Sequence, residues 1–267
     1  MKTKNRAKIA SFDIETSPTK AFIWRRWKEN IRLDQVISES YVLCAVVKFR
    51  HEKKTRKVAL PDFPKRWKAD SEDDYEVVKW CWEILDESDV IIAHNAKKFD
   101  IPVLNARFIA LGFGPPSPYK IVDTLEVAKK HFKFPYNSLD AIGEYLGLGR
   151  KIKTDFQLWK DCVAGIKSAW KKMVKYCDQD VLLLEKVYLR FLPWISNHPN
   201  LALYNLDETR PTCPKCFSHK VEWRGFQTTN TQIYHRFRCK ECGGWGRERY
   251  NATPKKNKKS IMTNIAS

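Results

Sequence analysis

Four carboxylates in three short segments are the residues of this sequence whose types and spacing could do chemistry. Asp13 and Glu15 lie in FDIET, Asp100 ends HNAKKFD, and Asp180 lies in YCDQD. Carboxylates that lie close together repel one another, so such a group is stable in a folded chain when cations lie between its members. Carboxylate oxygens are the ligands that hard divalent ions prefer. The sequence therefore predicts a divalent-metal site.

The two N-terminal acids belong to a segment that predicts a β-strand. In KIASFDIET the apolar residues Phe12 and Ile14 alternate with Asp13 and Glu15. Successive side chains of a strand point to opposite faces, so we expect both acids on one face and the apolar pair in a core. One strand then supplies two oxygen ligands.

The other two acids are expected on helices. Asp100 follows an apolar strand pattern, DVIIAH, and opens a helical pattern with Pro102 in its first turn, so both a cap and a metal ligand are reasonable roles. Tyr176 and Asp180 are four residues apart on a helix expected over residues 168–191, and they therefore share a face. Asp178 points about 200° away from Asp180 on that helix and is not counted as a ligand.

Together these residues resemble the three exonuclease motifs of the DEDD superfamily. The matching patterns are Asp13 and Glu15, the HN-x-x-x-FD form of residues 94–100, and the Y-x-x-x-D form of Tyr176 and Asp180. The tyrosine is typical of the DEDDy branch, as in the 3′–5′ proofreading domains of family B DNA polymerases. The resemblance covers about residues 8–191. It implies an α/β, ribonuclease H-like fold with a mixed sheet flanked by helices, and hydrolysis from a 3′ end with two Mg²⁺ or Mn²⁺ ions.

Two metal ions about 3.5–4 Å apart can activate water, hold a phosphate and stabilise the leaving 3′ oxygen. In this hypothesis Asp13 bridges both ions, Glu15 and Asp180 complete the water-activating site, and Asp100 holds the leaving-group metal. Tyr176 is expected to orient the attacking water, because an unperturbed phenol titrates near pH 10 and is a poor base. The alternative for Tyr176 is a half-buried helix aromatic, and His94 is expected to be a capped or packed histidine outside the catalytic set.

The charge of the chain favours a polyanionic partner. Lysine and arginine number 49 against 31 acids, a formal net charge of +18, so we expect nucleic acid, with DNA favoured and RNA left open. The segment AFIWRRWK at residues 21–28 interleaves tryptophan with arginine, which suits stacking on an unpaired base. Its alternative is an amphipathic helix with the tryptophans in the core. The candidate substrate contacts are Thr16, Trp24, Arg25 and, by resemblance only, Asn95.

The remainder of residues 1–206 predicts an α/β layer structure in one domain. Strands are expected over residues 41–49, 54–60 and 121–123, and helices over 71–87 and 137–147. Asp123 is expected as a strand-end polar residue near the site, and Asp140 as an acid in the first turn of a helix.

Two C-x-x-C pairs predict a second, smaller domain over residues 207–252. Cys213, Cys216, Cys239 and Cys242 form the pairs, with 22 residues between them. Four thiolates in this spacing are typical of a structural zinc ribbon with one Zn²⁺ ion, and the intervening segment alternates like a β-hairpin. The alternative is four reduced thiols or two disulfides. A basic, flexible tail is expected over residues 253–267.

The second domain is the more densely basic part of the chain. Residues 207–267 carry 13 lysines and arginines against 5 acids, which favours nucleic-acid binding over docking to a replication or repair protein. The four remaining cysteines and the lack of a signal peptide favour a reducing compartment, so we expect a cytoplasmic protein that can associate with the nucleoid. No stretch approaches the roughly 20 apolar residues of a membrane span. An endonuclease on the same fold and a noncatalytic nucleic-acid-binding adaptor remain alternatives to the exonuclease.

Overall fold

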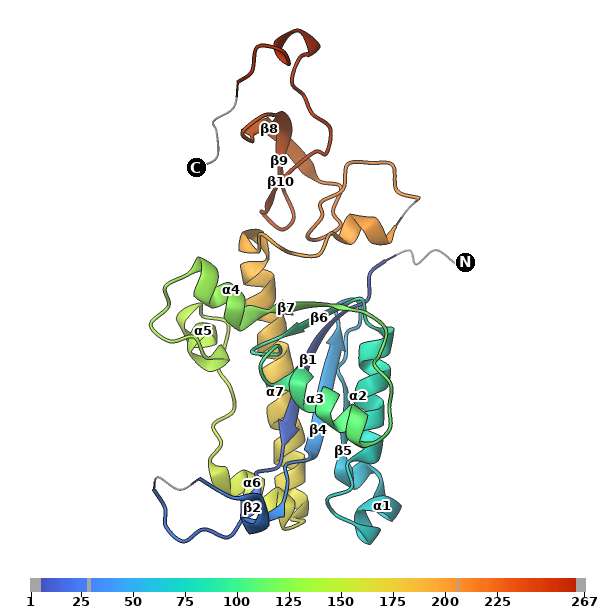
Figure 1. Cartoon of the computed structure of the whole chain (residues 1–267), viewed down its shortest axis with the longest axis vertical. Helices are drawn as coiled ribbons and strands as arrows, with labels where there is room; N and C mark the ends of the chain where they lie inside the picture. Colours follow the sequence, from blue (N-terminus) through green and yellow to red (C-terminus); the bar gives the residue numbers. More distant parts are fainter. Residues whose placement is uncertain (1–5, 28–29, 206, 263–267) are drawn as a thin grey trace. The chain divides into compact units, whose positions relative to one another are not determined.

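A computed structural model describes residues 6–27, 30–205 and 207–262 of the chain (Figure 1). Residues 8–188 form one unit, and residues 189–262 make up most of the described part of the other. The division falls within the last turn of a long helix, earlier than the boundary that the sequence predicts at residues 206 and 207. Within the described residues, no helix is long and apolar enough to cross a membrane.

The first unit is built on a five-stranded mixed sheet with strand order β5-β4-β1-β6-β7. The strand β1 pairs antiparallel with β4, which pairs antiparallel with β5, whereas β1, β6 and β7 run parallel. The predicted fold class, a mixed sheet flanked by helices, is confirmed. The strands of this unit, including a short separate pair β2 and β3, are β1 (Ile9–Thr16), β2 (Lys20–Ala21), β3 (Val36–Ser38), β4 (Val42–Phe49), β5 (Arg56–Ala59), β6 (Val90–Ala93) and β7 (Lys120–Asp123).

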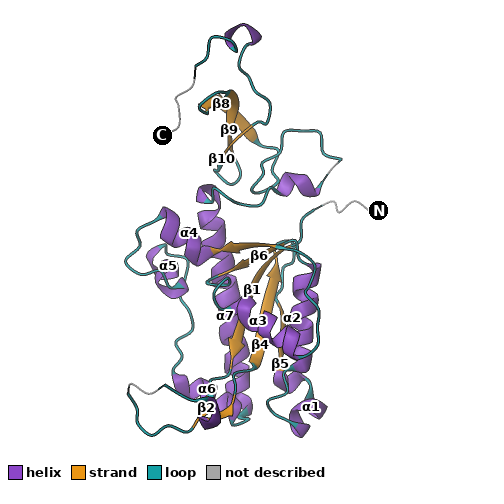
Figure 2. Cartoon of the chain, in the orientation of Figure 1, coloured by secondary structure: helices purple, strands orange, loops and turns teal. Residues whose placement is uncertain are grey.

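Helices cover both faces of this sheet, which Figures 1 and 2 show between α7 and the pair α2 and α3. A sheet covered on both faces needs strands that are apolar throughout, and β4 (VLCAVVKF) and β6 (VIIA) have that pattern and are almost completely buried. The helices are α1 (Pro64–Ala69), α2 (Tyr75–Glu87), α3 (Asp100–Ala110), α4 (Thr124–His131), α5 (Leu139–Tyr145), α6 (Phe156–Val163) and α7 (Lys167–Phe191). Short 3₁₀ turns lie at Leu33–Gln35 and Leu60–Asp62.

A buried ion pair ties two of the helices to the sheet. Asp74, directly before α2, is completely buried and lies 2.5 Å from the Arg107 guanidinium of α3. The same carboxylate accepts a 2.9 Å hydrogen bond from the Val42 N–H at the start of β4. A buried charge is stable only when it is paired and hydrogen-bonded, and Asp74 meets both conditions. The contact fixes α3, whose first residue is Asp100, relative to the central strands.

The longest helix, α7, lies against the face of β1 that carries the acids. Cys177 Sγ is 3.6 Å from a carboxylate oxygen of Asp13 and is completely buried. The apolar side chains of β1, Phe12 and Ile14, point to the opposite face and are buried there. The alternation predicted from the sequence is therefore the pattern that the structure adopts.

The second unit contains a three-stranded antiparallel sheet of order β10-β9-β8. Its strands are β8 (Val221–Thr228), β9 (Ile233–Cys239) and β10 (Trp245–Arg247), so the predicted hairpin is present with one further strand. Short 3₁₀ turns lie at Leu192–Trp194, Leu201–Tyr204 and Lys255–Asn257. Thr253, which the sequence assigns to the tail, is buried and its hydroxyl accepts a hydrogen bond from the Ile233 N–H. The rest of the expected tail lies partly outside the described residues.

Candidate active site

The structure brings the three acidic segments together. Ligand oxygens of Asp13, Glu15 and Asp180 all lie within 4.8 Å of one another, although the first two come from β1 and the third from α7. Asp100, the first residue of α3, is buried, and its Oδ1 accepts a 3.4 Å hydrogen bond from the Ile14 N–H between the two β1 acids. These four residues are called the acid cluster from here on. Their convergence is the geometry that a divalent-metal site requires.

Burial raises the pKa of every member of the acid cluster, and for Asp13 and Glu15 the charges of other members raise it further. Burial raises the pKa of Asp13 well above its ordinary value, with further contributions from Asp100, Glu15 and Asp180. The pKa of Glu15 rises to about 8 through burial and the Asp180 charge, and that of Asp100 rises to about 7, mainly through burial. The pKa of Asp180 is also raised by burial. Like-charged groups in a low dielectric cannot all ionise, so a cation is needed for the four carboxylates to be charged together.

One cation of the chain already lies at the cluster, and sequence reasoning missed it. Lys151 Nζ is 2.5 Å from Oδ2 of Asp180 and donates a 3.2 Å hydrogen bond to the Tyr176 hydroxyl. Burial opposes the charge of Lys151, but Asp180 and Tyr176 outweigh it and raise the pKa of the ammonium, which is therefore charged at neutral pH. Oδ1 of Asp180 is buried and has no hydrogen-bond donor among the described residues. An additional cation beside that oxygen would satisfy it.

The helix α5 holds the backbone that precedes Lys151. The Lys151 N–H donates a 2.7 Å hydrogen bond to Asp140, a first-turn residue of α5, as the sequence predicts for its position. A Cβ on Gly143 would lie 2.7 Å from the Gly149 carbonyl oxygen and 2.9 Å from a methyl carbon of Leu183. Only glycine permits this approach, so α5 and the turn that leads to Lys151 are packed in direct backbone contact.

Tyr176 is buried next to the cluster in a fixed orientation. Its ring meets Trp159 of α6 edge to face, with centroids 5.9 Å apart, while Lys151 lies 5.2 Å above its centre. Burial and the nearby Asp180 raise the pKa of the phenol above its ordinary value. Tyr176 is therefore a neutral hydroxyl at physiological pH. Its side chain is buried and is held in place from α6 and from the Lys151 loop.

Asp123 organises the loop between β6 and α3. As N-cap of α4 it accepts hydrogen bonds from Leu125 and Glu126, and it also accepts from the backbone of Asn95 at 2.9 Å and of Lys97 at 3.3 Å. Asn95 has a φ of 73°, a left-handed conformation that asparagine tolerates better than most residues. Asp123 therefore acts through backbone amides, and its charge adds to the raised pKa of Asp100.

Both ring nitrogens of His94 are within hydrogen-bonding distance of neighbouring segments. Its Nε2 donates to the Asn137 carbonyl oxygen at 3.0 Å, and its Nδ1 lies 2.9 Å from the Thr124 hydroxyl. Burial lowers the pKa of this imidazole, which favours the neutral ring. The histidine connects the end of β6 to α4 and to the segment before α5.

The segment of interleaved tryptophan and arginine is not a helix. Residues 22–27 follow β2 as irregular chain, with Trp24 93% and Trp27 82% exposed, so the alternative of a helix with buried tryptophans is wrong. Lys28 lies outside the described residues.

Thr16 ends β1, two positions after the Ile14 amide that binds Asp100, and a register irregularity lies between it and Glu15. Thr16 therefore belongs to the strand that carries two of the acids, whereas residues 22–27 are separated from that strand by β2.

Comparisons with known proteins agree with this geometry. A family model described as RNase_H superfamily matches residues 38–192, more than half of the chain. The chain belongs to the RNase H superfamily. The family B DNA polymerase from the hyperthermophilic archaeon Pyrobaculum calidifontis shares this fold, with a TM-score of 0.50 and 18% sequence identity over 70% of this chain. The chain spans 25% of that polymerase, and no curated protein matches it.

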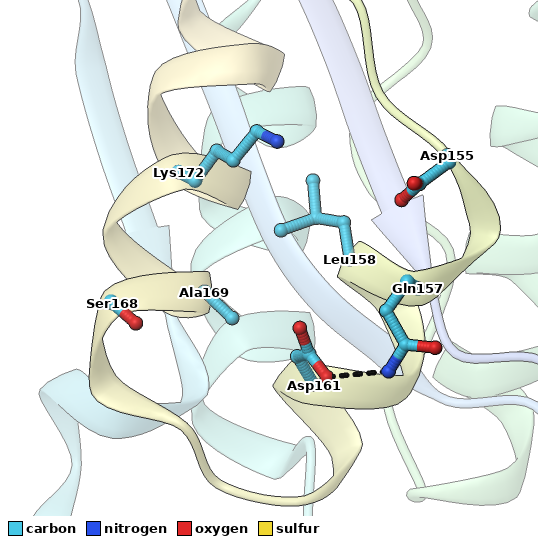
Figure 3. A pocket seen from close by; sticks show the side chains of 7 residues that line it. All are labelled: Asp155, Gln157, Leu158, Asp161, Ser168, Ala169 and Lys172. Carbon is cyan, nitrogen blue, oxygen red and sulfur yellow. Dashed lines mark hydrogen bonds between the residues drawn. The ribbon is translucent and has the colours of Figure 1, made fainter.

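This RNase H superfamily protein also has a hollow of about 240 Å³ in the same unit, apart from the acid cluster (Figure 3). Asp155, Gln157 and Asp161 approach it from the α6 side and Lys172 from α7, and Gln157 donates a 2.7 Å hydrogen bond to Asp161. Its two carboxylates are not part of a close group of metal ligands among the described residues. We therefore place no chemistry there.

The RNase H superfamily match ends before the four cysteines, which also converge. The Sγ atoms of Cys213, Cys216, Cys239 and Cys242 all lie within 4.8 Å of one another. Two of these separations are 3.7 and 3.5 Å, much longer than the roughly 2.05 Å of a disulfide and close to the roughly 3.8 Å edge of a tetrahedron with Zn–S bonds of about 2.3 Å. The four thiols fit a zinc ion, and neither His219 nor His235 belongs to this group.

Proposed function

We propose that this protein is a divalent-metal-dependent 3′–5′ exonuclease of the DEDDy type that hydrolyses phosphodiester bonds of nucleic acid, with DNA favoured over RNA. The observation that supports it best is the convergence of Asp13, Glu15 and Asp180 within 4.8 Å, with Asp100 hydrogen-bonded to the backbone between the first two. The second support is Tyr176, fixed one helical turn before Asp180 on the same helix. Acids and tyrosine together form the pattern that the DEDDy resemblance implies.

The acid cluster would hold two Mg²⁺ or Mn²⁺ ions. Bound ions of this kind lower the pKa of water and stabilise charge on the attacking and leaving oxygens. Asp13 lies close to Glu15 and Asp180, and the charge of Asp100 also acts on it, so its carboxylate would be the ligand shared between the two ions. Glu15 and Asp180 would complete the site next to Tyr176, while Asp100 would hold the ion on the side of the leaving group.

Tyr176 and Lys151 have distinct parts in this proposal. Because its pKa is raised, the Tyr176 hydroxyl stays protonated and can orient a water molecule but does not remove its proton. Lys151 neutralises Asp180 in the free protein, and its ammonium can turn to a non-bridging phosphate oxygen once ions occupy the cluster. Lys151 thus provides a positive charge at the position where negative charge develops.

Substrate contacts are proposed outside the acid cluster as well. Thr16 ends β1, the exposed Trp24 and Arg25 follow β2, and Asn95 follows β6. Exposed aromatic and guanidinium groups suit stacking on unpaired bases and contact with phosphates. The ribbon, with one structural Zn²⁺, would assist in binding the strand, and a replication or repair protein is a further proposed partner.

The decisive experiment compares two acids of the cluster with a third acid that lies on α7 outside the cluster. Asp13→Ala and Asp180→Ala should abolish Mg²⁺-dependent degradation of 5′-labelled single-stranded DNA and RNA while leaving binding largely intact. Asp178→Ala is the matched control, because this acid points to Thr55 and Lys57 and should leave the rate nearly unchanged. Unchanged nuclease rates in the Asp13 and Asp180 variants would reject the assignment.

Substrate design separates an exonuclease from an endonuclease. An exonuclease must spare an oligonucleotide whose 3′ end is blocked, and it releases single nucleotides from a free end. Cutting of the blocked strand within its length would instead show an endonuclease on the same fold. Binding with no hydrolysis of either substrate, in any divalent ion, would favour a noncatalytic adaptor.

A further inference from the structure

Strand pairing gives the ribbon sheet two chemically different faces. Residues that lie directly opposite each other on paired strands share a face, and Arg236 lies opposite Arg247 while Arg238 lies opposite Trp245. The arginine face consists of Glu222, Gln227, Tyr234, Arg236, Arg238, Trp245 and Arg247. The aromatic face consists of Val221, Trp223, Phe226, His235, Phe237 and Cys239.

A bulge in β8 keeps the two faces separate. The register shifts between Trp223 and Phe226, where Gly225 has a φ of 67°. Simple alternation would place Phe226 with the arginines, but the extra residue turns it to His235, with ring centroids 4.7 Å apart. Gln227 then falls on the arginine face.

The arginine face contains a repulsive pair. Arg236 and Arg247 lie directly opposite each other, and like charges in such pairs destabilise a sheet. Within the ranges that the structure describes, neither of them forms an ion pair with a carboxylate, and the one acid of the face, Glu222, is bonded to Arg224. Proteins keep such unfavourable pairs mainly at functional sites, so an anion from outside is the expected partner.

The guanidinium groups of Arg236 and Arg247 are oriented by aromatic rings and a backbone carbonyl, none of which carries a negative charge. Arg236 lies 5.2 Å from the Trp245 ring centre and donates through Nε to the Arg224 carbonyl oxygen at 2.6 Å. Arg247 lies 3.6 Å above the Tyr234 ring. Since ring contacts restrict the side chains before a ligand arrives, less conformational entropy is lost on binding.

A hollow of about 340 Å³ opens on this face, lined by Gln227, Arg236, Trp245 and Gly246. No carboxylate is among its lining residues. Trp245 is 50% exposed, so part of its ring is available to a flat ligand. The hollow thus combines a stacking surface, an amide and a guanidinium, which are the groups that recognise an unpaired base and its phosphates.

We infer that the arginine face of the ribbon binds an unpaired stretch of nucleic acid, with one base stacked on Trp245 beside Gln227 and adjacent phosphates on Arg236 and Arg247. The choice of nucleic acid rests on the proposed function of the chain. A run of aspartates and glutamates would satisfy the charge but would have no ring to stack on the exposed indole. The aromatic face, in contrast, has no lysine or arginine: its Phe237 and Cys239 are buried, and its Trp223 and Phe226 are about half exposed.

Two tryptophans of nearly equal exposure provide the test. Trp245 on the arginine face is 50% exposed and Trp223 on the aromatic face is 48% exposed. Fluorescence anisotropy of a labelled single-stranded oligonucleotide is measured with full-length protein in an Asp13→Ala background without added divalent ions, so that neither turnover nor the acid cluster contributes. The zinc content of each variant confirms that the ribbon is folded.

Trp245→Ala should weaken binding by about 5- to 150-fold, the range for loss of one base stack, while Trp223→Ala should not. Arg236→Gln with Arg247→Gln should lower the slope of log K against log salt by roughly 1.4, because each phosphate contact to a single strand contributes about 0.7. Lys220→Gln, which removes a charge already paired with Glu241, is the control.

Equal affinities of the two tryptophan variants, or an unchanged salt slope in the arginine variant, would overturn the inference. Polyglutamate and unlabelled single-stranded DNA are also compared as competitors at equal concentration of charge. If polyglutamate displaced the oligonucleotide equally well, the surface would recognise charge alone, and the inference would again be overturned. Because binding is measured without hydrolysis, these outcomes do not depend on whether the acid cluster is a nuclease centre.

Discussion

Raising the pH should destabilise this protein when divalent cations are absent. Burial and the charge of Asp180 raise the pKa of Glu15 to about 8 in the folded chain, whereas a glutamate in an unfolded chain titrates near 4.3. The folded state therefore retains a proton that the unfolded state has released. This contribution to stability is complete below the unfolded pKa and is lost as the pH rises through the folded pKa.

The size of the effect follows from the pKa of Glu15. Between the two pKa values, one such group reduces the free energy of unfolding by about 1.4 kcal/mol per pH unit, so about 2–3 kcal/mol is lost from pH 6 to pH 8. For a chain of this size that corresponds to a fall in Tm of roughly 5–10 °C. Glu15→Gln cannot ionise and should lack this part of the dependence.

Urea unfolding followed by far-ultraviolet circular dichroism measures the difference, because long helices occur in the unit that carries the acid cluster. Wild type, Glu15→Gln and the control Glu126→Gln, an exposed residue, are compared at both pH values after dialysis against buffer without divalent ions. Added Mg²⁺ should restore stability mainly at the higher pH and mainly in the wild type and the control. Parallel pH dependence in wild type and Glu15→Gln would refute the electrostatic interpretation of the cluster.

Four further expectations concern activity, stability and metal content. At low Mg²⁺ the nuclease rate should rise from about pH 6 to pH 8. A higher Mg²⁺ concentration should shift this pH profile to lower pH, because ions and protons compete for the same carboxylates. The shift is measured from pH–rate profiles at two Mg²⁺ concentrations. Lys151→Met should lower kcat by roughly 10- to 100-fold, with partial recovery in Lys151→Arg, in steady-state assays on single-stranded DNA; a wild-type kcat would show that the ion pair with Asp180 is dispensable. Asp123→Ala should cost about 1–2 kcal/mol in urea unfolding, since a helix cap is lost, and an unchanged midpoint would contradict that role. Protein prepared under reducing conditions should contain about one zinc ion per chain by mass spectrometry, and Cys216→Ser should lose it, whereas Cys81→Ser, at a buried core position, should keep it.

Regular elements account for most of what the sequence predicts correctly. The alternation of Phe12, Asp13, Ile14 and Glu15 determines which side chains share a face, because a strand has only two faces. The spacing of Tyr176 and Asp180 works in the same way on a helix. Where backbone geometry is regular, residue types and spacing are enough to place side chains. The apolar strands indicate burial on both faces, whereas the mixed strand directions are implied only by the resemblance to the DEDD superfamily.

Irregular segments account for what the sequence does not predict. Lys151 reaches Asp180 from the loop between α5 and α6, and nothing distinguishes it among 49 basic residues. The segment around Trp24 contains enough apolar residues for a helix, yet the structure leaves it as exposed irregular chain. Asp123 is expected only as a polar residue near the site, because its backbone partners come from a loop with no pattern of its own.

The backbone contact between Gly143 and Gly149 couples the position of α5 to that of Lys151. No side chain cushions the two segments, so a displacement of α5 passes directly to the turn and from there to the ammonium beside Asp180. Gly143→Ala would add a single methyl group here and leave every charged group of the site in place. That methyl would lie against both the Gly149 carbonyl oxygen and Leu183 of α7, so it would shift the turn before Lys151, the helix that carries Asp180, or both.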